Sequence, residues 1–209
     1  MKSCIRVRAL FLAFVITLLA ACSTTSLTSR WNDPQYQGPA LSKILVIGIF
    51  KDDTRRRQFE QEFSQLITQG ERTGIASYSE MPDLKNADEK EEVLEVVNKT
   101  GADGVLIVTF QGVSKEQREV PPTVDYVPTM GFGYGMYSYY GMGYSTVYRP
   151  GYTVTDKIVR LDIKLFDVKT EKMVWAGKSE SFNPSSAQSV INELAKLVID
   201  DMKKSGIVK

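Results

Sequence analysis

The sequence predicts an α/β domain with a mixed sheet and three helices. Two continuous apolar runs, residues 44–47 and 105–108, are typical of strands that are buried on both faces of a sheet. Amphipathic helical patterns lie between them and at the C-terminal end, and residues 159–165 alternate between apolar and charged side chains. The expected order is β-α-β-α-β, then a β-hairpin and a C-terminal helix.

The first five elements are expected along residues 43–108. A strand over 43–50 precedes a helix whose apolar stripe is followed by Gly70, a natural C-cap. A short strand over 75–79 and a second helix over 87–99, stopped by Gly101, lead to the strand at 105–108. This alternation predicts right-handed crossovers and a parallel sheet core. The stripe of the first helix consists of Phe59, Phe63, Leu66 and Ile67.

The last three elements are expected along residues 159–206. The alternating strand is followed by a turn at 167–172 and a returning strand over 173–182, which together form a hairpin. Asn183 and Pro184 are a cap residue and a residue favoured at the first helical position, so the final helix is expected to open there. An antiparallel hairpin beside a parallel core makes the sheet mixed.

The N-terminal residues have the features of a lipoprotein signal. Three basic residues precede an apolar stretch over 10–20, which is too short for a membrane-spanning helix of about 20 residues. The stretch ends in Leu19-Ala20-Ala21-Cys22, which resembles the bacterial lipobox. The resemblance implies cleavage after residue 21, acylation of Cys22 and stable membrane anchoring. Because Ser23 is not aspartate, it also implies sorting to the outer membrane, with the domain facing the periplasm.

The amino-acid composition excludes several classes of catalytic and binding site. The chain has no histidine, and both cysteines lie within residues 1–22, so the mature chain would have no free thiol or disulfide. Without histidine, the Ser-His-Asp and Cys-His nucleophiles and histidine-ligated zinc are excluded. The 26 basic and 25 acidic residues nearly balance, and three of the basic residues lie in 1–21, so the mature chain is mildly acidic and gives no basis for nucleic-acid binding. We expect neither an enzyme nor a cofactor or metal.

Residues 22–41 are rich in Ser, Thr, Pro, Gln and Gly and predict a flexible tether, which leaves residues 42–209 as a single domain. Segments of this domain resemble small envelope lipoproteins that share the fold of the TolB N-terminal domain. That group includes activators of penicillin-binding proteins, the curli-secretion channel subunit and lipoproteins of unknown function. The resemblance implies this fold over about 42–206 and a binding or assembly role, and it brings no active-site motif. It is carried by Lys43-Ile44-Leu45-Val46-Ile47, by Thr100-Gly101-Ala102-Asp103-Gly104-Val105-Leu106-Ile107, and by Leu161-Asp162-Ile163-Lys164-Leu165-Phe166-Asp167 leading to Val174-Trp175-Ala176-Gly177.

Three consecutive arginines, Arg55, Arg56 and Arg57, lie at the junction of the first strand and the first helix. Cations in the first turn of a helix are unfavourable, because the N-terminal end of the helix dipole is itself positive, so this run is unusual at such a position. One interpretation is that Asp52 and Asp53 offset these charges while the guanidiniums point into water. The other is an anion site for phosphate or carboxylate groups of the envelope, namely lipid A phosphates, peptidoglycan carboxylates or an acidic partner.

Residues 126–152 form a Tyr/Gly-rich insert that contains eight of the ten tyrosines and a single charge, Arg149. A loop of this length within a compact domain is usually functional or disordered. Three interpretations stay open: a loop without a fixed partner, a recognition loop for protein or glycan, and a membrane-inserting β-hairpin of an oligomeric barrel. The recognition loop would use Tyr134, Tyr137, Tyr139, Tyr140 and Tyr144.

The leading prediction is an outer-membrane-anchored periplasmic lipoprotein that is a non-enzymatic binding or assembly module. Its partner would be an envelope protein or peptidoglycan, and an oligomer is compatible with this role. The alternative prediction is a subunit of an oligomeric outer-membrane pore or secretion channel.

Overall fold

A computed structural model describes residues 24–82, 90–128 and 144–209 of the protein. The signal residues 1–21 and Cys22 lie outside this described part. The strands are β1 (Thr25–Asn32), β2 (Lys43–Ile49), β3 (Thr73–Ala76), β4 (Gly104–Val120), β5 (Thr123–Pro128), β6 (Tyr144–Arg149), β7 (Tyr152–Asp167) and β8 (Lys172–Phe182). The helices are α2 (Asp53–Ile67), α3 (Lys90–Thr100) and α5 (Ala187–Lys204), with a 3-10 turn η1 (Ser77–Ser79).

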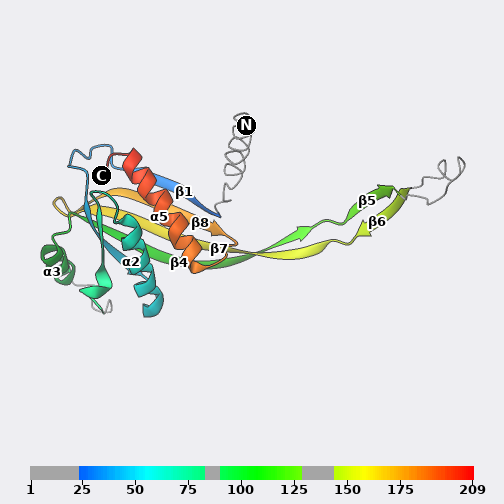
Figure 1. The fold of residues 1–209 in the computed structure, drawn as a ribbon, viewed down its shortest axis with the longest axis horizontal. Helices are drawn as coiled ribbons and strands as arrows, with labels where there is room; N and C mark the ends of the chain where they lie inside the picture. Colours follow the sequence, from blue (N-terminus) through cyan, green and yellow to red (C-terminus); the bar gives the residue numbers. More distant parts are fainter. Residues whose placement is uncertain (1–23, 83–89, 129–143) are drawn as a thin grey trace, which may run out of the picture.

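The predicted α/β fold with a mixed sheet is confirmed (Figure 1). Six strands form the main sheet in the order β1-β8-β7-β4-β2-β3, and β5 and β6 form a second, two-stranded sheet. The β2–β3 and β2–β4 pairs are parallel, as expected from the strand–helix alternation, whereas the β4–β7, β7–β8 and β8–β1 pairs are antiparallel.

The helices cover the sheet on two faces. Ile44 and Val46 of β2 belong to the larger core, which also contains buried side chains of α2 and α5. Leu66, which was predicted in the apolar stripe of α2, is exposed instead. Leu45 and Ile47 point to the opposite face and pack with Val96 and Val97 of α3. Because successive side chains of a strand point to opposite faces, the continuous apolar run of β2 serves both cores at once.

The prediction of a flexible tether over residues 22–41 is wrong for Thr25–Asn32. These residues form β1, an edge strand that pairs antiparallel with β8 from Thr25↔Ser181 to Asn32↔Trp175. Two side-chain contacts also tie the strand to α5: the Thr25 amide donates to Glu193 Oε2 at 2.8 Å, and Arg30 Nη1 lies 2.6 Å from Asp201 Oδ1. Because β1 is stabilised by strand pairing and remote carboxylates, its polar local sequence does not reveal it.

The last helix opens later than the sequence predicts. Ser186 is its N-cap: the Ser186 hydroxyl accepts from the Ser189 amide at 3.0 Å, and the Ser189 hydroxyl accepts from the Ser186 amide, which completes a capping box. Asn183 instead lies in a left-handed conformation with φ 45°. Its side chain accepts from the Lys157 amide and donates to Asp156, both at 2.7 Å, so it joins the end of β8 to β7.

Candidate functional site: a projecting β-arm and the groove at its base

A two-stranded ribbon projects from the domain (Figure 1). The pairing of β4 with β2 ends at Thr109, and the pairing of β7 with β8 begins at Ile158. Beyond these two points, the described residues form one antiparallel ribbon. We call residues 115–128 and 144–157 of this ribbon the arm. At about 3.3 Å per residue, the arm is on the order of 40 Å long.

Two irregularities shape the arm. Gly112 has φ +125° and lies in a β-bulge of β4, where the register with β7 shifts next to the domain. Such a bulge bends a strand and increases its twist, so it sets the direction in which the arm leaves. Further out, Pro121 and Pro122 interrupt the strand, since proline cannot donate to a ladder. Opposite them Gly151 is required, because a Cβ there would lie 2.7 Å from the Val120 carbonyl oxygen.

The two halves of the arm differ in chemistry. The proximal half, residues 115–120 and 152–157, contains exposed charged side chains such as Lys115, Glu116 and Glu119. The distal half, β5 and β6, has only Asp125 and Arg149 as charges, and they pair with each other at 3.0 Å. The arm therefore changes from a solvated stalk to an apolar, aromatic end. Large hydrophobic side chains exposed on the distal half are Val124, Tyr126, Val127, Val147 and Tyr148.

The distal half has two unlike faces. In an antiparallel pair, directly opposed residues share a face. The pairs Val124↔Tyr148 and Tyr126↔Thr146 therefore lie on one face, which we call the aromatic face. Tyr126 and Tyr148 are 70% and 63% exposed, so this face offers two uncovered rings. The opposite face carries the Asp125–Arg149 ion pair.

Most tyrosines of the predicted recognition loop cannot be placed. Tyr134, Tyr137, Tyr139 and Tyr140 lie in residues 129–143, outside the described residues. Tyr144 is the first residue of β6, and its backbone is paired with Pro128. The described ends of the expected insert are thus ladder-forming strands, and Tyr126, Tyr148 and Tyr152 are the exposed rings described within residues 126–152.

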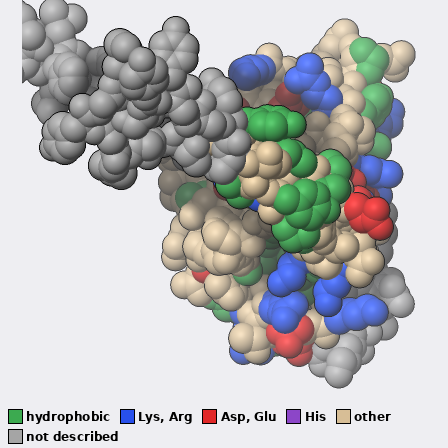
Figure 2. Space-filling view, turned by 90° about the vertical axis from the view of Figure 1, so that its right-hand side faces the viewer, with side chains coloured by type: hydrophobic (Ala, Val, Ile, Leu, Met, Phe, Trp, Pro, Cys, Tyr) green, Lys and Arg blue, Asp and Glu red, His purple; other side chains and the backbone are tan. Residues whose placement is uncertain are grey.

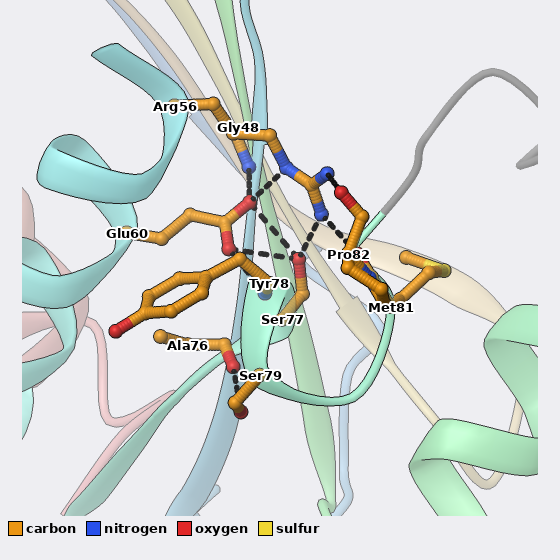
Figure 3. A network of polar contacts seen from close by, with 9 residues as sticks. All are labelled: Gly48, Arg56, Glu60, Ala76, Ser77, Tyr78, Ser79, Met81 and Pro82. Carbon is orange, nitrogen blue, oxygen red and sulfur yellow. Dashed lines mark hydrogen bonds and ion pairs between the residues drawn. The ribbon is translucent and has the colours of Figure 1, made fainter. Parts of the chain in front are cut away.

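The arginine run does not act as a unit, because Arg56 is buried (Figure 3). Its guanidinium is 1% exposed and lies 2.9 Å from Glu60 Oε1, one turn further along α2. The same guanidinium donates to the Ser77 hydroxyl at 3.1 Å and to the Met81 carbonyl at 2.8 Å. Glu60 also accepts from the amides of Gly48 and Tyr78. Arg56 therefore joins α2 to β2 and η1 and is not available to an external anion.

Arg55 and Arg57 are exposed, and Arg55 borders a groove whose described lining does not include Arg57. A groove of about 440 Å³ lies between the N-terminal ends of α2 and α5, over β4 and β7, and we call it the α2–α5 groove. Lys51, Asp52 and Arg55 lie on its rim. Phe50 contacts Phe59 and Phe110, with ring centroids 5.0 and 6.0 Å apart. The apolar lining includes Phe50, Phe59, Phe110, Val113, Leu161 and Val190.

The groove lies at the base of the arm, because Val113 of β4 and Val159 of β7 belong to its lining. Figure 2 shows the molecule from the side to which the arm projects. Hydrophobic side chains gather at the centre of this face, and Lys and Arg side chains lie above and below them. At the groove itself, the apolar side chains of the lining lie beside Lys51 and Arg55 of the rim.

Within residues 24–82, 90–128 and 144–209, no group of His, Cys, Asp or Glu side chains has the arrangement of a metal site. No helix in the same residues is long and apolar enough to cross a membrane.

Residues 93–204 match the family described as "Domain of unknown function (DUF4136)", and this span covers more than half of the chain. The chain belongs to the DUF4136 family. The matched region begins in α3 and ends at the last residue of α5, so the DUF4136 domain includes the whole arm. No curated protein matches the sequence.

Several solved structures are similar to the DUF4136 chain at low identity. A PelC dodecamer from Paraburkholderia phytofirmans is 11% identical with a TM-score of 0.43, and the likeness covers 83% of this chain and 94% of that chain. The lipoprotein GNA1162 from Neisseria meningitidis is 13% identical with a TM-score of 0.38, covering 78% of this chain and 99% of that chain. At these TM-scores, neither likeness supports an argument about function or assembly.

Proposed function

We propose that this protein is a lipid-anchored module of the bacterial outer membrane that faces the periplasm. It binds another envelope component, without catalysis, through the aromatic face of its arm. The observation that carries the proposal is the arm itself, which the domain holds away from its core and whose distal half exposes Val124, Tyr126 and Tyr148.

An exposed arm of this kind has low stability and tends to aggregate unless a partner covers it. A lone two-stranded ribbon is at best marginally stable in water, and a hydrophobic strand edge invites association. Here the distal half buries neither face against the domain, and within the described residues β5 and β6 pair only with each other. A partner that covers the aromatic face would supply the contacts that the ribbon lacks.

The chemistry of the aromatic face suits a protein partner. Tyrosine combines a large apolar ring with a polar hydroxyl and is enriched in protein–protein interfaces, where charged residues are depleted at the centre. Tyr126 and Tyr148 provide such groups, and the Asp125–Arg149 pair on the other face remains solvated. Peptidoglycan glycan strands, which also stack on aromatic rings, are the other partner that the experiment must distinguish.

The experiment compares matched changes on the two faces of the arm. Tyr126→Thr with Tyr148→Thr removes both rings of the aromatic face, whereas Val127→Thr with Val147→Thr makes the same number of changes on the opposite face. Threonine retains strand propensity in both variants. The first pair should abolish co-purification of the partner from chemically crosslinked envelopes, and the second should preserve it. Equal retention by both variants would refute the role of the aromatic face.

A second candidate is a subunit of an oligomeric pore, because both outer edges of the β5–β6 ribbon are unpaired within the described residues. Arms from several copies would then pair edge to edge. A spanning strand needs about 9–11 residues, whereas β5 and β6 have 6 each within the described residues. Recovery of this chain itself as the sole crosslinked partner, with ion conductance in planar bilayers, would favour the pore.

The anchor is tested separately. Mass spectrometry of the N-terminal peptide should show Cys22 as the first residue, carrying acyl chains. The Cys22→Ala chain should lose this modification and leave the outer-membrane fraction. An unmodified Cys22 in the mature protein would refute the lipoprotein proposal and leave the arm experiment intact.

A further inference from the structure

The rim of the α2–α5 groove is electrostatically positive. Asp52 lies on this rim, but its carboxylate caps α2 by accepting from the Arg55 amide at 2.8 Å, so its charge faces the positive end of the helix. Within the described part of the chain, no carboxylate forms an ion pair with Lys51 or Arg55. The rim therefore carries two cations and one carboxylate, a net charge of +1, and neither cation forms an ion pair within the described residues.

The shape and lining of the groove suit a hydrocarbon chain. Its volume of about 440 Å³ lies in the range of about 300–1,000 Å³ that is usual for small-molecule sites. Phenylalanine rings and aliphatic side chains line it, and Pro184, Ser186 and Ala187 form the side toward α5. A ligand that satisfies both parts of this site has an apolar tail and an anionic head.

The chain also enters the domain close to the groove. The Phe182 amide donates to the Thr24 carbonyl at 2.8 Å, and the Thr25 amide donates to Glu193 of α5. Thr24 is thus fixed to the end of β8, and the connection from β8 to α5 that follows contains Pro184 and Ser186, which border the groove. We call this connection the β8–α5 corner. Cys22 precedes Thr24 by only two residues in the sequence. An anchor at Cys22 would bring this corner against the membrane.

We propose that the α2–α5 groove binds an acyl chain of an acidic phospholipid from the leaflet in which Cys22 is anchored. Lys51 and Arg55 contact the phosphate, and the phenylalanine cluster contacts the chain. This inference rests on the proposed lipidation of Cys22 for the position of the membrane. The acyl chains on Cys22 itself are less suitable occupants, because they are uncharged and would leave both cations unpaired.

The test uses the mature chain, residues 22–209, with Cys22→Ser, so that no lipid of its own competes. Titration with lysophosphatidylglycerol below its micelle concentration, followed by calorimetry and native mass spectrometry, should show binding of one molecule. Lysophosphatidylcholine, which has the same chain but no net charge, should bind about tenfold more weakly. Glycerophosphoglycerol, which has the head without the chain, should not bind.

Matched variants locate the site. Arg55→Glu should weaken binding of lysophosphatidylglycerol about tenfold, whereas Arg57→Glu, the same charge change on an exposed residue outside the groove lining, should leave it within about twofold. Ala187→Trp should block the groove and abolish binding. Because Ala187 is exposed, this change should leave the far-ultraviolet circular dichroism of the chain unaltered, which confirms folding.

Three results would overturn the proposal: no binding of lysophosphatidylglycerol, equal binding of the uncharged lipid, or binding that survives Ala187→Trp. An equal effect of Arg55→Glu and Arg57→Glu would also overturn it, since that pattern indicates attraction to the surface as a whole. Because the chain tested has no lipid, none of these outcomes bears on whether Cys22 is acylated.

Discussion

Substituting Arg56 should destabilise the domain far more than substituting its neighbour Arg57. Arg56 and Glu60 are 1% and 0% exposed, and removing one partner of a buried pair leaves an uncompensated charge. Such a change costs about 3–5 kcal/mol, whereas a substitution at an exposed site is usually within about 0.5 kcal/mol. Arg56→Met replaces the guanidinium side chain by an unbranched apolar one without charge, and Arg57→Met makes the identical change at a solvent-exposed position.

The assay is urea unfolding of residues 24–209, followed by tryptophan fluorescence. The signal reports mainly on Trp175, which is fully buried, because Trp31, the other tryptophan, is already 44% exposed in the folded chain. With a slope of about 2 kcal/mol per molar urea, Arg56→Met should lower the midpoint by about 1.5–2.5 M, and Arg57→Met by no more than about 0.3 M.

A double-mutant cycle distinguishes the ion pair from simple packing. Glu60→Gln retains the shape of the side chain and removes its charge, so it should be destabilising alone and less so in the presence of Arg56→Met. The interaction energy should fall within about 0.5–3 kcal/mol. The account would be refuted if Arg56→Met cost no more than Arg57→Met, or if the double variant equalled the sum of the single ones.

Four further outcomes are expected, each measured by urea unfolding. Asp201→Ala should cost about 1–3 kcal/mol, because the Trp175 indole N–H, which donates to Asp201 at 2.9 Å, would be left buried without its acceptor; Asp200→Ala, at an exposed site, is the control. Ser186→Ala should cost about 1 kcal/mol, since the hydroxyl caps α5; no loss would contradict the revised helix start. Gly74→Ala should destabilise the domain by about 1–3 kcal/mol, because the new Cβ would lie 2.3 Å from the Ser64 carbonyl oxygen; unchanged stability would contradict this close approach. Burial, with the negative charge of Asp167, raises the pKa of Tyr36 to about 12, so folding favours the neutral phenol; this stabilisation is complete below pH 10 and disappears as the pH rises toward 12. The Tyr36→Phe chain should therefore lose less stability over that interval, and equal losses would contradict the assignment.

The sheet core could be predicted from the sequence because its strands have strong local signals. The continuous apolar runs of β2 and β4 and the alternation of β7 follow directly from burial on two faces or one. The strand β1 has no such signal, since its partners are the backbone of β8 and the carboxylates of Glu193 and Asp201, all far along the chain. Edge strands that depend on remote partners are not encoded in local periodicity.

The candidate site was predictable only in part. Consecutive arginines suggested one exposed cluster, yet Arg56 lies three residues before Phe59 and seven before Phe63, on the buried stripe of α2. That spacing, together with Glu60 at i+4, is the signal that could have separated it from its neighbours. The groove was not predicted because its lining comes from the β2–α2 loop, α2, β4, β7 and the start of α5, which only the fold brings together.

The central claim is that the arm contacts a specific envelope component through its distal half. A photo-crosslinking amino acid at position 126, in living cells, tests it most directly when compared with the same group at Glu119, an exposed site in the charged half of the same ribbon. Mass spectrometry should identify one dominant crosslinked protein from position 126 and none above background from position 119. The same products from both positions, or only scattered neighbours from position 126, would contradict the claim.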